Sequence, residues 1–279
     1  MSAAPARDFS FEFFPPRTPQ GREKLRAIWQ QLARLKPRFF SCTYGAGGST
    51  REGTHETVLD IRAAGHEAAP HISSVASTRA DVAEQLELYR KHGIRHIVAL
   101  RGDLPSGIAA SGEFRYASEL VAYIRATTGD WFRIEVACYP EYHPQTRNAA
   151  DEIRNFKQKV DAGADGAITQ YFYNSDAYFE FVDDCRAAGI TLPIVPGVMP
   201  IGNFSQLARF SDACGAEIPR WMRFKLESFR DDSASIRAFG LDVVTELCER
   251  LLSGGAPGLH FYTLNQAGLT STIWQRLGL

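Results

Sequence analysis

The chain has 279 residues, of which 44% are hydrophobic and 23% are charged, a composition typical of a globular protein. Its 31 Lys and Arg residues balance 32 Asp and Glu residues, which excludes the basic surface expected for binding nucleic acid or an anionic membrane. No apolar run approaches the ~18 residues that span a bilayer. The first residues, "MSAAPARDFS", lack the apolar segment of a secretory signal. The five cysteines are dispersed and form no C-x-x-C pair, so we expect neither disulfides nor structural zinc, and a cytoplasmic location.

An amphipathic segment, a glycine and an apolar segment recur in this order along the chain. In "VAEQLELYRKHGIRHIVAL", the residues Val82, Leu86 and Tyr89 have the spacing of one helix face. The apolar segments are continuous rather than alternating, as in a parallel sheet covered by helices. The glycines stand where a helix ends in a left-handed conformation, at Gly65, Gly93, Gly163 and Gly189.

This pattern predicts eight strands separated by helices. We expect the strands near 8–14, 39–44, 68–73, 94–100, 133–139, 166–173, 193–198 and 258–263, and a closing helix near 266–277. The interval 199–257 is long enough for one or two extra helices. Eight strand–helix units in about 250 residues indicate a (β/α)8 TIM barrel. A doubly wound open sheet is the alternative. Because no linker interrupts the pattern, we expect residues 1–279 to form a single domain.

Polar residues follow the predicted strands, at the end of the barrel where TIM-barrel enzymes carry their active sites. Taken singly, Glu12 is compatible with a core carboxylate, His71 with a structural histidine, and Arg101 with a turn ion pair to Asp103. Their convergence on one face of the barrel favours a functional site. The full set comprises Glu12, Thr43, His71, Arg101, Asp103, Tyr139, Glu141, His143, Gln170, Tyr262, Asn265 and Gln266.

Several cofactor motifs are absent from the sequence. "GAGGST" would need glycine in place of Thr50 to match the dinucleotide-binding G-x-G-x-x-G pattern, and no phosphate-binding G-x-x-x-x-G-K-[ST] occurs. There is no H-x-H or H-E-x-x-H, so we expect no metal site. No lysine lies in or directly after a predicted strand, which argues against a Schiff base. We therefore expect carboxylates, a glutamine and aromatic side chains to act with a bound organic cofactor.

Seven segments between about residues 8 and 270 resemble bacterial methylenetetrahydrofolate reductases: "FSFEFFPPR", "TYGAGGSTR", "ALRGDLP", "YPEYHP", "DAGADGAITQYFY", "IVPGVMPI" and "HFYTLN". The resemblance implies a TIM barrel with bound FAD that uses NADH or NADPH to reduce 5,10-methylenetetrahydrofolate to 5-methyltetrahydrofolate. It also implies ping-pong kinetics, a role in supplying methionine synthesis, and a homo-oligomer. We expect no inhibition by S-adenosylmethionine, whose binding region follows the barrel in eukaryotic members. The alternatives are another folate-binding barrel without redox activity and a non-enzymatic binding module.

The resemblance assigns two catalytic residues. Glu12 would be the general acid, and its aromatic neighbours Phe11, Phe13 and Phe14 predict a raised pKa by disfavouring the charged form. Asp103 would favour positive charge on the folate and lower the reduction potential of the flavin.

The remaining assignments concern binding. Arg101 and Lys159 would meet the FAD pyrophosphate. The FAD contacts implied by the resemblance are Thr43, His71, Leu100, Arg101, Gly102, Asp103, Tyr116, Ala117, Tyr139, His143, Glu152, Asn155, Lys159 and Ile168. The substrate contacts are Glu12, Gln170, Phe204, Leu264 and Gln266. Several relatives have arginine at the position of Gln266, facing the glutamate tail of folate. The sequence leaves the choice between NADH and NADPH open.

Overall fold

The computed structural model describes residues 7–44, 51–75, 77–102 and 112–279. Along this part of the chain, parallel strands alternate with helices, as the recurring sequence pattern predicts. The strands are β1 (Asp8–Phe13), β2 (Phe39–Cys42), β3 (Ala68–Ser73), β4 (His96–Leu100), β5 (Arg133–Cys138), β6 (Gly166–Thr169), β7 (Ile194–Val195), β8 (Gly197–Val198) and β9 (Gly258–Tyr262).

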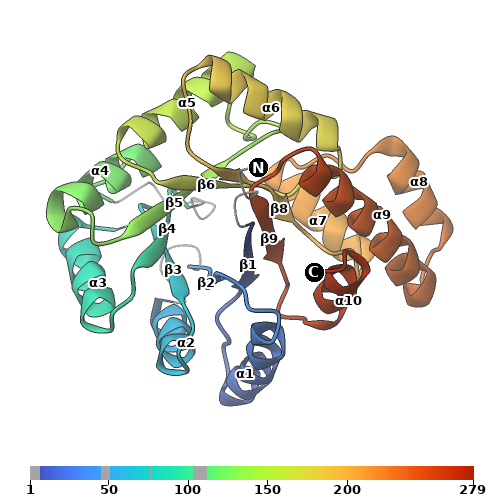
Figure 1. Cartoon of the computed structure of the whole chain (residues 1–279), viewed down its shortest axis with the longest axis horizontal. Coiled ribbons are helices and arrows are strands. Elements are labelled where there is room, and N and C mark those ends of the chain that lie inside the picture. The colour runs from blue at the N-terminus through green and yellow to red at the C-terminus, as the bar shows by residue number, and fades with distance from the viewer. Residues whose placement is uncertain (1–6, 45–50, 76, 103–111) are drawn as a thin grey trace, which may run out of the picture.

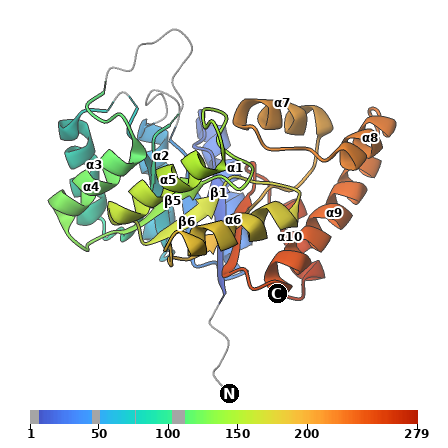
Figure 2. The same cartoon turned by 90° about the horizontal axis from the view of Figure 1, so that it is seen from above.

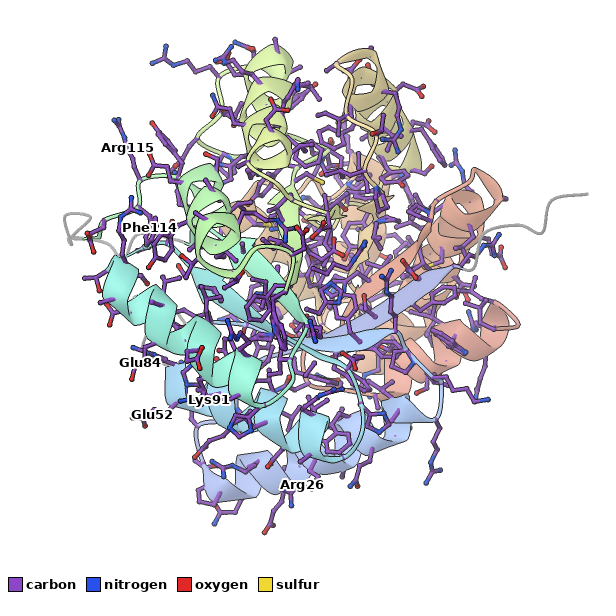
Figure 3. All side chains as sticks on the ribbon, turned by 60° about the vertical axis from the view of Figure 1, so that its left-hand side comes forward. Arg26, Glu52, Glu84, Lys91, Phe114 and Arg115 are labelled. Atoms are coloured by element: carbon purple, nitrogen blue, oxygen red, sulfur yellow. The ribbon has the colours of Figure 1, made fainter. Side chains whose placement is uncertain are left out.

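The helices lie outside the strands, and the chain runs around the ring from blue to red in Figure 1. Polar side chains point away from the strands, as the labelled Arg26, Glu52, Glu84 and Lys91 illustrate (Figure 3). The helices are α1 (Pro19–Ala33), α2 (Arg51–Ala63), α3 (Arg79–Lys91), α4 (Ala117–Thr128), α5 (Ala149–Asp161), α6 (Ser175–Ala187), α7 (Phe204–Cys214), α8 (Arg220–Ser228), α9 (Ser233–Ser253) and α10 (Gly268–Arg276). None of the helices in the described residues is long and apolar enough to cross a membrane.

The strands close into a parallel barrel, which confirms the predicted fold class over the open-sheet alternative. Their order is β7-β6-β5-β4-β3-β2-β1-β9-β8, so the first strand pairs with the last. The predicted seventh strand is divided at Pro196, which has no N–H to donate to a ladder. β7, before the proline, pairs with β6, and β8, after it, pairs with β9. This one segment therefore joins the two edges of the sheet.

Local predictions also agree with the structure in most places. The four helix-ending glycines have positive φ, from 68° at Gly93 to 111° at Gly163. The interval 199–257 holds α7 and α8, which lie at the upper right of Figure 2, before α9 leads back to the barrel. The largest difference in length is at β6, which ends at Thr169, so the buried aromatic residues 171–173 lie beyond its ladder.

The inside of the barrel contains an apolar layer with polar clusters on both sides of it. Phe39, Ala69, Val98 and Ile168 form this layer, and Phe39 is 5% exposed. Phe39 contacts a histidine of each polar cluster, with its ring centroid 4.1 Å from that of His96 and 6.1 Å from that of His260. TIM-barrel interiors are usually filled by branched apolar residues, so the two polar clusters require a separate explanation.

Candidate active site

Glu12 points into the barrel because side chains alternate along β1. Its neighbours Phe11 and Phe13 point outward and pack beneath the helices, with the ring of Phe11 5.8 Å from that of Trp274. Phe14 is 42% exposed. The predicted aromatic surroundings of Glu12 are therefore wrong, because residues adjacent in a strand face opposite sides of the sheet.

Polar groups from three other strands surround the Glu12 carboxylate. Its Oε2 atom lies 3.2 Å from Nε2 of His71 and 3.3 Å from Nε2 of His260, and it accepts a 3.4 Å hydrogen bond from Ser41 Oγ. Burial raises the pKa of Glu12, but the two histidines outweigh burial and lower it to about 2. The prediction of a raised pKa is thus wrong, and at neutral pH the carboxylate of the free protein is ionised.

His260 belongs to this cluster but was not singled out from the sequence. Its ring is fully buried, and Nδ1 lies 2.7 Å from Ser10 Oγ. Ser10 and His260 occupy paired positions on β1 and β9. The alternation of β1 combined with closure of the barrel is the signal that would have found this contact. The motif "HFYTLN" contains His260, but no local pattern indicates that it faces Glu12.

Two cations, Lys159 and Arg101, lie close enough for their charges to interact. Lys159 extends from α5 and its Nζ donates a 2.6 Å hydrogen bond to the carbonyl oxygen of Ala137. Burial lowers the pKa of Lys159, and the positive charge of Arg101 lowers it further. Arg101, directly after β4, donates a 2.6 Å hydrogen bond to Oε1 of Gln145. Neighbouring cations repel each other, so this arrangement is suited to an anionic ligand.

Tyr139 and His143, two of the predicted cofactor contacts, lie in the loop after β5, and a third, Glu152, lies on α5, which follows this loop. Glu152 is 2% exposed, and its Oε2 accepts hydrogen bonds of 3.2 Å from the backbone N–H of His143 and 2.8 Å from Thr146 Oγ1. The rings of Tyr139 and His143 meet edge to face, with centroids 4.8 Å apart. Glu152 thus holds the loop in place, and its direct contact with the cofactor stays a prediction.

The turn after β4 requires glycine at position 102. The carbonyl oxygen of Arg101 accepts a 2.9 Å hydrogen bond from Ser73 Oγ. Gly102 has a φ of 82°, and a Cβ there would collide with the Ser73 hydroxyl. Glycine is therefore required for the close approach of β3 and β4 beyond Leu100. Asp103 lies outside the described residues, and its catalytic role stays a prediction.

Other predicted cofactor residues lie around the barrel. The backbone N–H of Thr43, just after β2, donates a 2.9 Å hydrogen bond to the carbonyl oxygen of Phe13. Tyr116 and Ala117 begin α4, with Tyr116 46% exposed. Asn155 is exposed on α5, and Ile168 belongs to the apolar layer inside the barrel. Their roles as cofactor contacts stay predictions.

The predicted substrate residues lie after β6, β8 and β9. Gln170 directly follows β6, Phe204 begins α7, and both are half-buried. Leu264 is half-buried with a φ of 52°, whereas Gln266 is exposed. The side chain of the intervening Asn265 accepts a 2.8 Å hydrogen bond from the N–H of Phe14 and donates a 2.9 Å bond to its carbonyl oxygen. This clasp joins the loops that follow the first and last strands.

A second carboxylate lies beside Gln170. Glu141 lines a small cavity with Tyr139, Gln170, Tyr171 and Cys214, and its Oε2 accepts a 2.7 Å hydrogen bond from the backbone N–H of Glu217. Its Oε1 is buried without a hydrogen-bond partner in the described part of the chain. Burial raises the pKa of Glu141 to about 7, and the nearby charge of Glu217 raises it in addition.

The other polar cluster inside the barrel lies near the beginnings of β4, β5 and β6. Glu135 Oε1 is 3.2 Å from His96 Nε2 and accepts a 3.0 Å hydrogen bond from Arg133 Nε. Burial raises the pKa of Glu135, but His96 and Arg133 produce a net lowering. A Cβ at Gly166 would collide with the Glu135 carboxylate.

Within the described ranges, no group of three or more His, Cys, Asp or Glu residues could hold a metal ion.

Comparisons with known proteins identify the family to which the chain belongs. The sequence profile of the family described as methylenetetrahydrofolate reductase matches residues 2–278. The 5,10-methylenetetrahydrofolate reductase of Salmonella typhimurium is 41% identical over 272 residues, which cover 97% of this chain and 90% of the relative. Methylenetetrahydrofolate reductase (NADH) 1 of Arabidopsis thaliana is 39% identical over 285 residues, covering 97% of this chain and 48% of the plant protein.

A solved structure is similar in fold. An uncharacterized protein from Clostridium thermocellum that binds two copies of 5-methyl-5,6,7,8-tetrahydrofolic acid has a TM-score of 0.67 and 16% sequence identity, covering 97% of this chain and 94% of that one. At this identity the match supports the barrel alone.

Barrel and family together define an oxidoreductase of folate one-carbon metabolism. The chain belongs to the methylenetetrahydrofolate reductase family, and its activity is the NAD(P)H-dependent reduction of methylenetetrahydrofolate. This confirms the family and the reaction expected from the sequence. A redox-inactive folate barrel and a non-enzymatic binding module are both excluded.

Proposed function

We propose that the chain reduces 5,10-methylenetetrahydrofolate with FAD as the bound flavin and Glu12 as the proton donor. The observation that carries this proposal is the position of Glu12: a carboxylate 8% exposed in the barrel, at the end of β1, with titratable partners at 3.2 and 3.3 Å. A proton donor must be buried enough to exclude bulk water and must be linked to a group that can supply a proton.

The chemistry requires such a group. To accept a hydride, the five-membered ring of methylenetetrahydrofolate must open: an amine nitrogen is protonated, its bond to the methylene carbon breaks, and an iminium cation forms. Glu12 would deliver the proton to that nitrogen and, once ionised again, would stabilise the cation. Asp103 would add a second negative charge, as expected from the family resemblance. Gln170 would orient the pterin or the nicotinamide carboxamide through its side-chain amide.

The residues present fit FAD. The neighbouring cations Arg101 and Lys159 suit the two negative charges of a pyrophosphate. A 2.6 Å hydrogen bond to the carbonyl oxygen of Ala137 fixes the position of the Lys159 ammonium group. The edge-to-face rings of Tyr139 and His143 add aromatic surface nearby. When bound, FAD would supply the hydride. Alternate use of one site by nicotinamide and folate would give ping-pong kinetics.

The test of this proposal is a flavin titration with a matched pair of variants. We expect purified protein to bind FAD with a yellow absorbance that NADH or NADPH bleaches without oxygen. Lys159→Met should weaken FAD affinity by about tenfold or more, because one charge-assisted phosphate contact is lost. Lys157→Met, on the same helix, removes a lysine that pairs with Asp161 on the surface, and should leave the affinity unchanged. Equal affinities for the two variants would contradict the assignment of Lys159.

Three further expectations accompany this proposal and remain to be measured: a homo-oligomer, a single domain and a cytoplasmic location. Adding NADH and NADPH separately to the flavin-bound protein without oxygen, and comparing the rates at which the flavin absorbance is bleached, measures the preference between the two nucleotides.

A further inference from the structure

A small cavity beside the end of β6 is lined by two polar side chains, only one of which has an expected role. Glu141, from the loop after β5, and Gln170, directly after β6, line this cavity together with Tyr139. Because Tyr139 is a predicted FAD contact, the cavity borders the place expected for the flavin. Its volume is about 10 Å³, which is room for about one water molecule. A substrate group that enters it must therefore be small.

The two carboxylate oxygens of Glu141 differ in their contacts. Oε2 accepts a 2.7 Å hydrogen bond from the backbone N–H of Glu217, whereas Oε1 is buried without a hydrogen-bond partner among the described residues. Burial raises the pKa of Glu141 to about 7, as expected for a carboxylate with too few donors. A ligand N–H directed at Oε1 would supply the missing donor and stabilise the ionised carboxylate.

Gln170 offers the opposite hydrogen-bonding group. Its Oε1 accepts a 3.0 Å hydrogen bond from the backbone N–H of Tyr171, which leaves its NH₂ group to donate to a ligand. The cavity thus presents one acceptor, from Glu141, and one donor, from Gln170. A primary carboxamide has the complementary pair, because its carbonyl oxygen accepts and its NH₂ group donates.

We propose that Glu141 is a further substrate contact, which recognises the carboxamide of the reduced nicotinamide together with Gln170. This role rests on Gln170 being a substrate contact. A carboxamide projects from its ring and can enter a cavity of this size, whereas the carbonyl and neighbouring N–H of a pterin belong to a fused ring. The nicotinamide must also lie against the flavin to reduce it, and Tyr139 places the cavity beside the flavin.

The loop that carries Glu141 is held against the end of α7. Gly215, directly after α7, has a φ of 78°, and a Cβ there would lie 2.9 Å from Cγ of Pro144. This close approach and the hydrogen bond from Glu217 to Glu141 join the two segments on both sides of the cavity. The carboxylate is therefore positioned before a ligand arrives, which reduces the entropy lost on binding.

The test compares two nucleotides that differ only at this group. One is the reduced nicotinamide dinucleotide, and the other is its reduced 3-acetylpyridine analogue, which keeps the carbonyl and has methyl in place of NH₂. The dependence of anaerobic flavin bleaching on nucleotide concentration gives an apparent Kd for each. We expect the FAD-loaded wild type to bind the carboxamide about tenfold more tightly, because a hydrogen bond to a charged group is lost with the analogue.

Glu141→Gln removes the acceptor and keeps the shape of the side chain. Its amide oxygen can retain the hydrogen bond from the Glu217 N–H, and its NH₂ group then meets the NH₂ group of the carboxamide. We expect the Kd of the carboxamide nucleotide to rise about tenfold and that of the analogue to change less than about twofold, so that the preference is lost. The Kd of methylenetetrahydrofolate in flavin reoxidation should stay within about twofold of wild type.

Glu217→Gln is the matched control, because it changes an exposed side chain and leaves the backbone N–H that binds Glu141. Both nucleotide Kd values should be those of wild type. Equal binding of the two nucleotides by wild type would overturn the proposal, and so would equal weakening of both in Glu141→Gln, since the carboxylate would then act only on the loop. Weaker folate binding with an unchanged nucleotide preference would assign the pair to the pterin and also overturn it. Wild-type affinity of Gln170→Leu for nucleotide and folate would instead remove Gln170 from the proposed site.

Discussion

Two carboxylates inside the same barrel, Glu12 and Glu135, have similar burial and a lowered pKa, yet their partners differ in kind. Glu135 contacts Arg133, which stays protonated at any physiological pH, as well as His96. Glu12 contacts two histidines and a serine, and no permanent cation among the described residues. The apolar layer containing Phe39 lies between them.

If Glu12 is the proposed proton donor, the difference separates a structural carboxylate from a catalytic one within the same barrel. A carboxylate fixed by arginine gains little from taking up a proton, so it remains a charged structural element. A carboxylate fixed by histidines can exchange a proton with them, because imidazole titrates in the physiological range. The identity of the cation, rather than the depth of burial, distinguishes the two clusters.

The strongest test of this comparison is Glu12→Gln. The amide keeps the shape of the side chain and removes the transferable proton, so we expect the folate half-reaction to fall by about 100-fold to 10,000-fold. Reduction by nicotinamide should continue, because it needs no proton from Glu12. Stopped-flow absorbance of the flavin measures both steps separately. Retention of folate reduction would place the acid elsewhere.

Glu135→Gln should affect stability and leave catalysis intact. Loss of the carboxylate leaves Arg133 and His96 without their charged partner, and we expect about 1–3 kcal/mol less free energy of unfolding at neutral pH. Because the folded protein holds the Glu135 pKa below its ordinary value of 4.5, this contribution is present above that pH and is lost as the pH falls below it. Chemical denaturation across this range measures it. A slowed folate half-reaction at unchanged stability would contradict the separation.

Glu141 offers a third case, a carboxylate with no cationic partner among the described residues. Its pKa is raised from 4.5 to about 7, so ionisation costs stability as the pH rises through that interval. Glu141→Gln should match wild type near pH 5 and exceed its stability near pH 8 by up to about 1 kcal/mol, since the half-buried group keeps part of its hydration. Thermal unfolding at the two pH values measures the effect. Glu217→Gln, which removes the neighbouring charge alone, should reproduce it in part.

The fold was accessible from the sequence because each strand–helix unit carries its own signal. Amphipathic spacing, helix-ending glycines and continuous apolar strands are local features, and they placed most elements within a few residues. The division at Pro196 was not predicted, because a change of strand partner depends on how the barrel closes. The end of β6 was misplaced because buried aromatic residues continue past the ladder.

The site could be predicted from the sequence only in part, because its contacts depend on how the barrel closes. The family resemblance proposed Glu12 and Lys159 as site residues, and these roles remain predictions. The surroundings of Glu12 were inferred from its sequence neighbours Phe11 and Phe13, which face the other side of the sheet. His260 lies 248 positions away from Glu12, and only the pairing of β1 with β9 brings them together. Applying the two-residue alternation to closed neighbouring strands would have corrected both errors.

The pairing of β1 with β9 has a consequence for how the protein matures. The strand that carries Glu12 is synthesised well before the strand that carries His260, and contacts of such long sequence separation are slow to form in folding. A nascent or truncated chain therefore has its acid in place without the histidine partner from β9. The acid cluster is therefore assembled only after β9 has been made and has paired with β1.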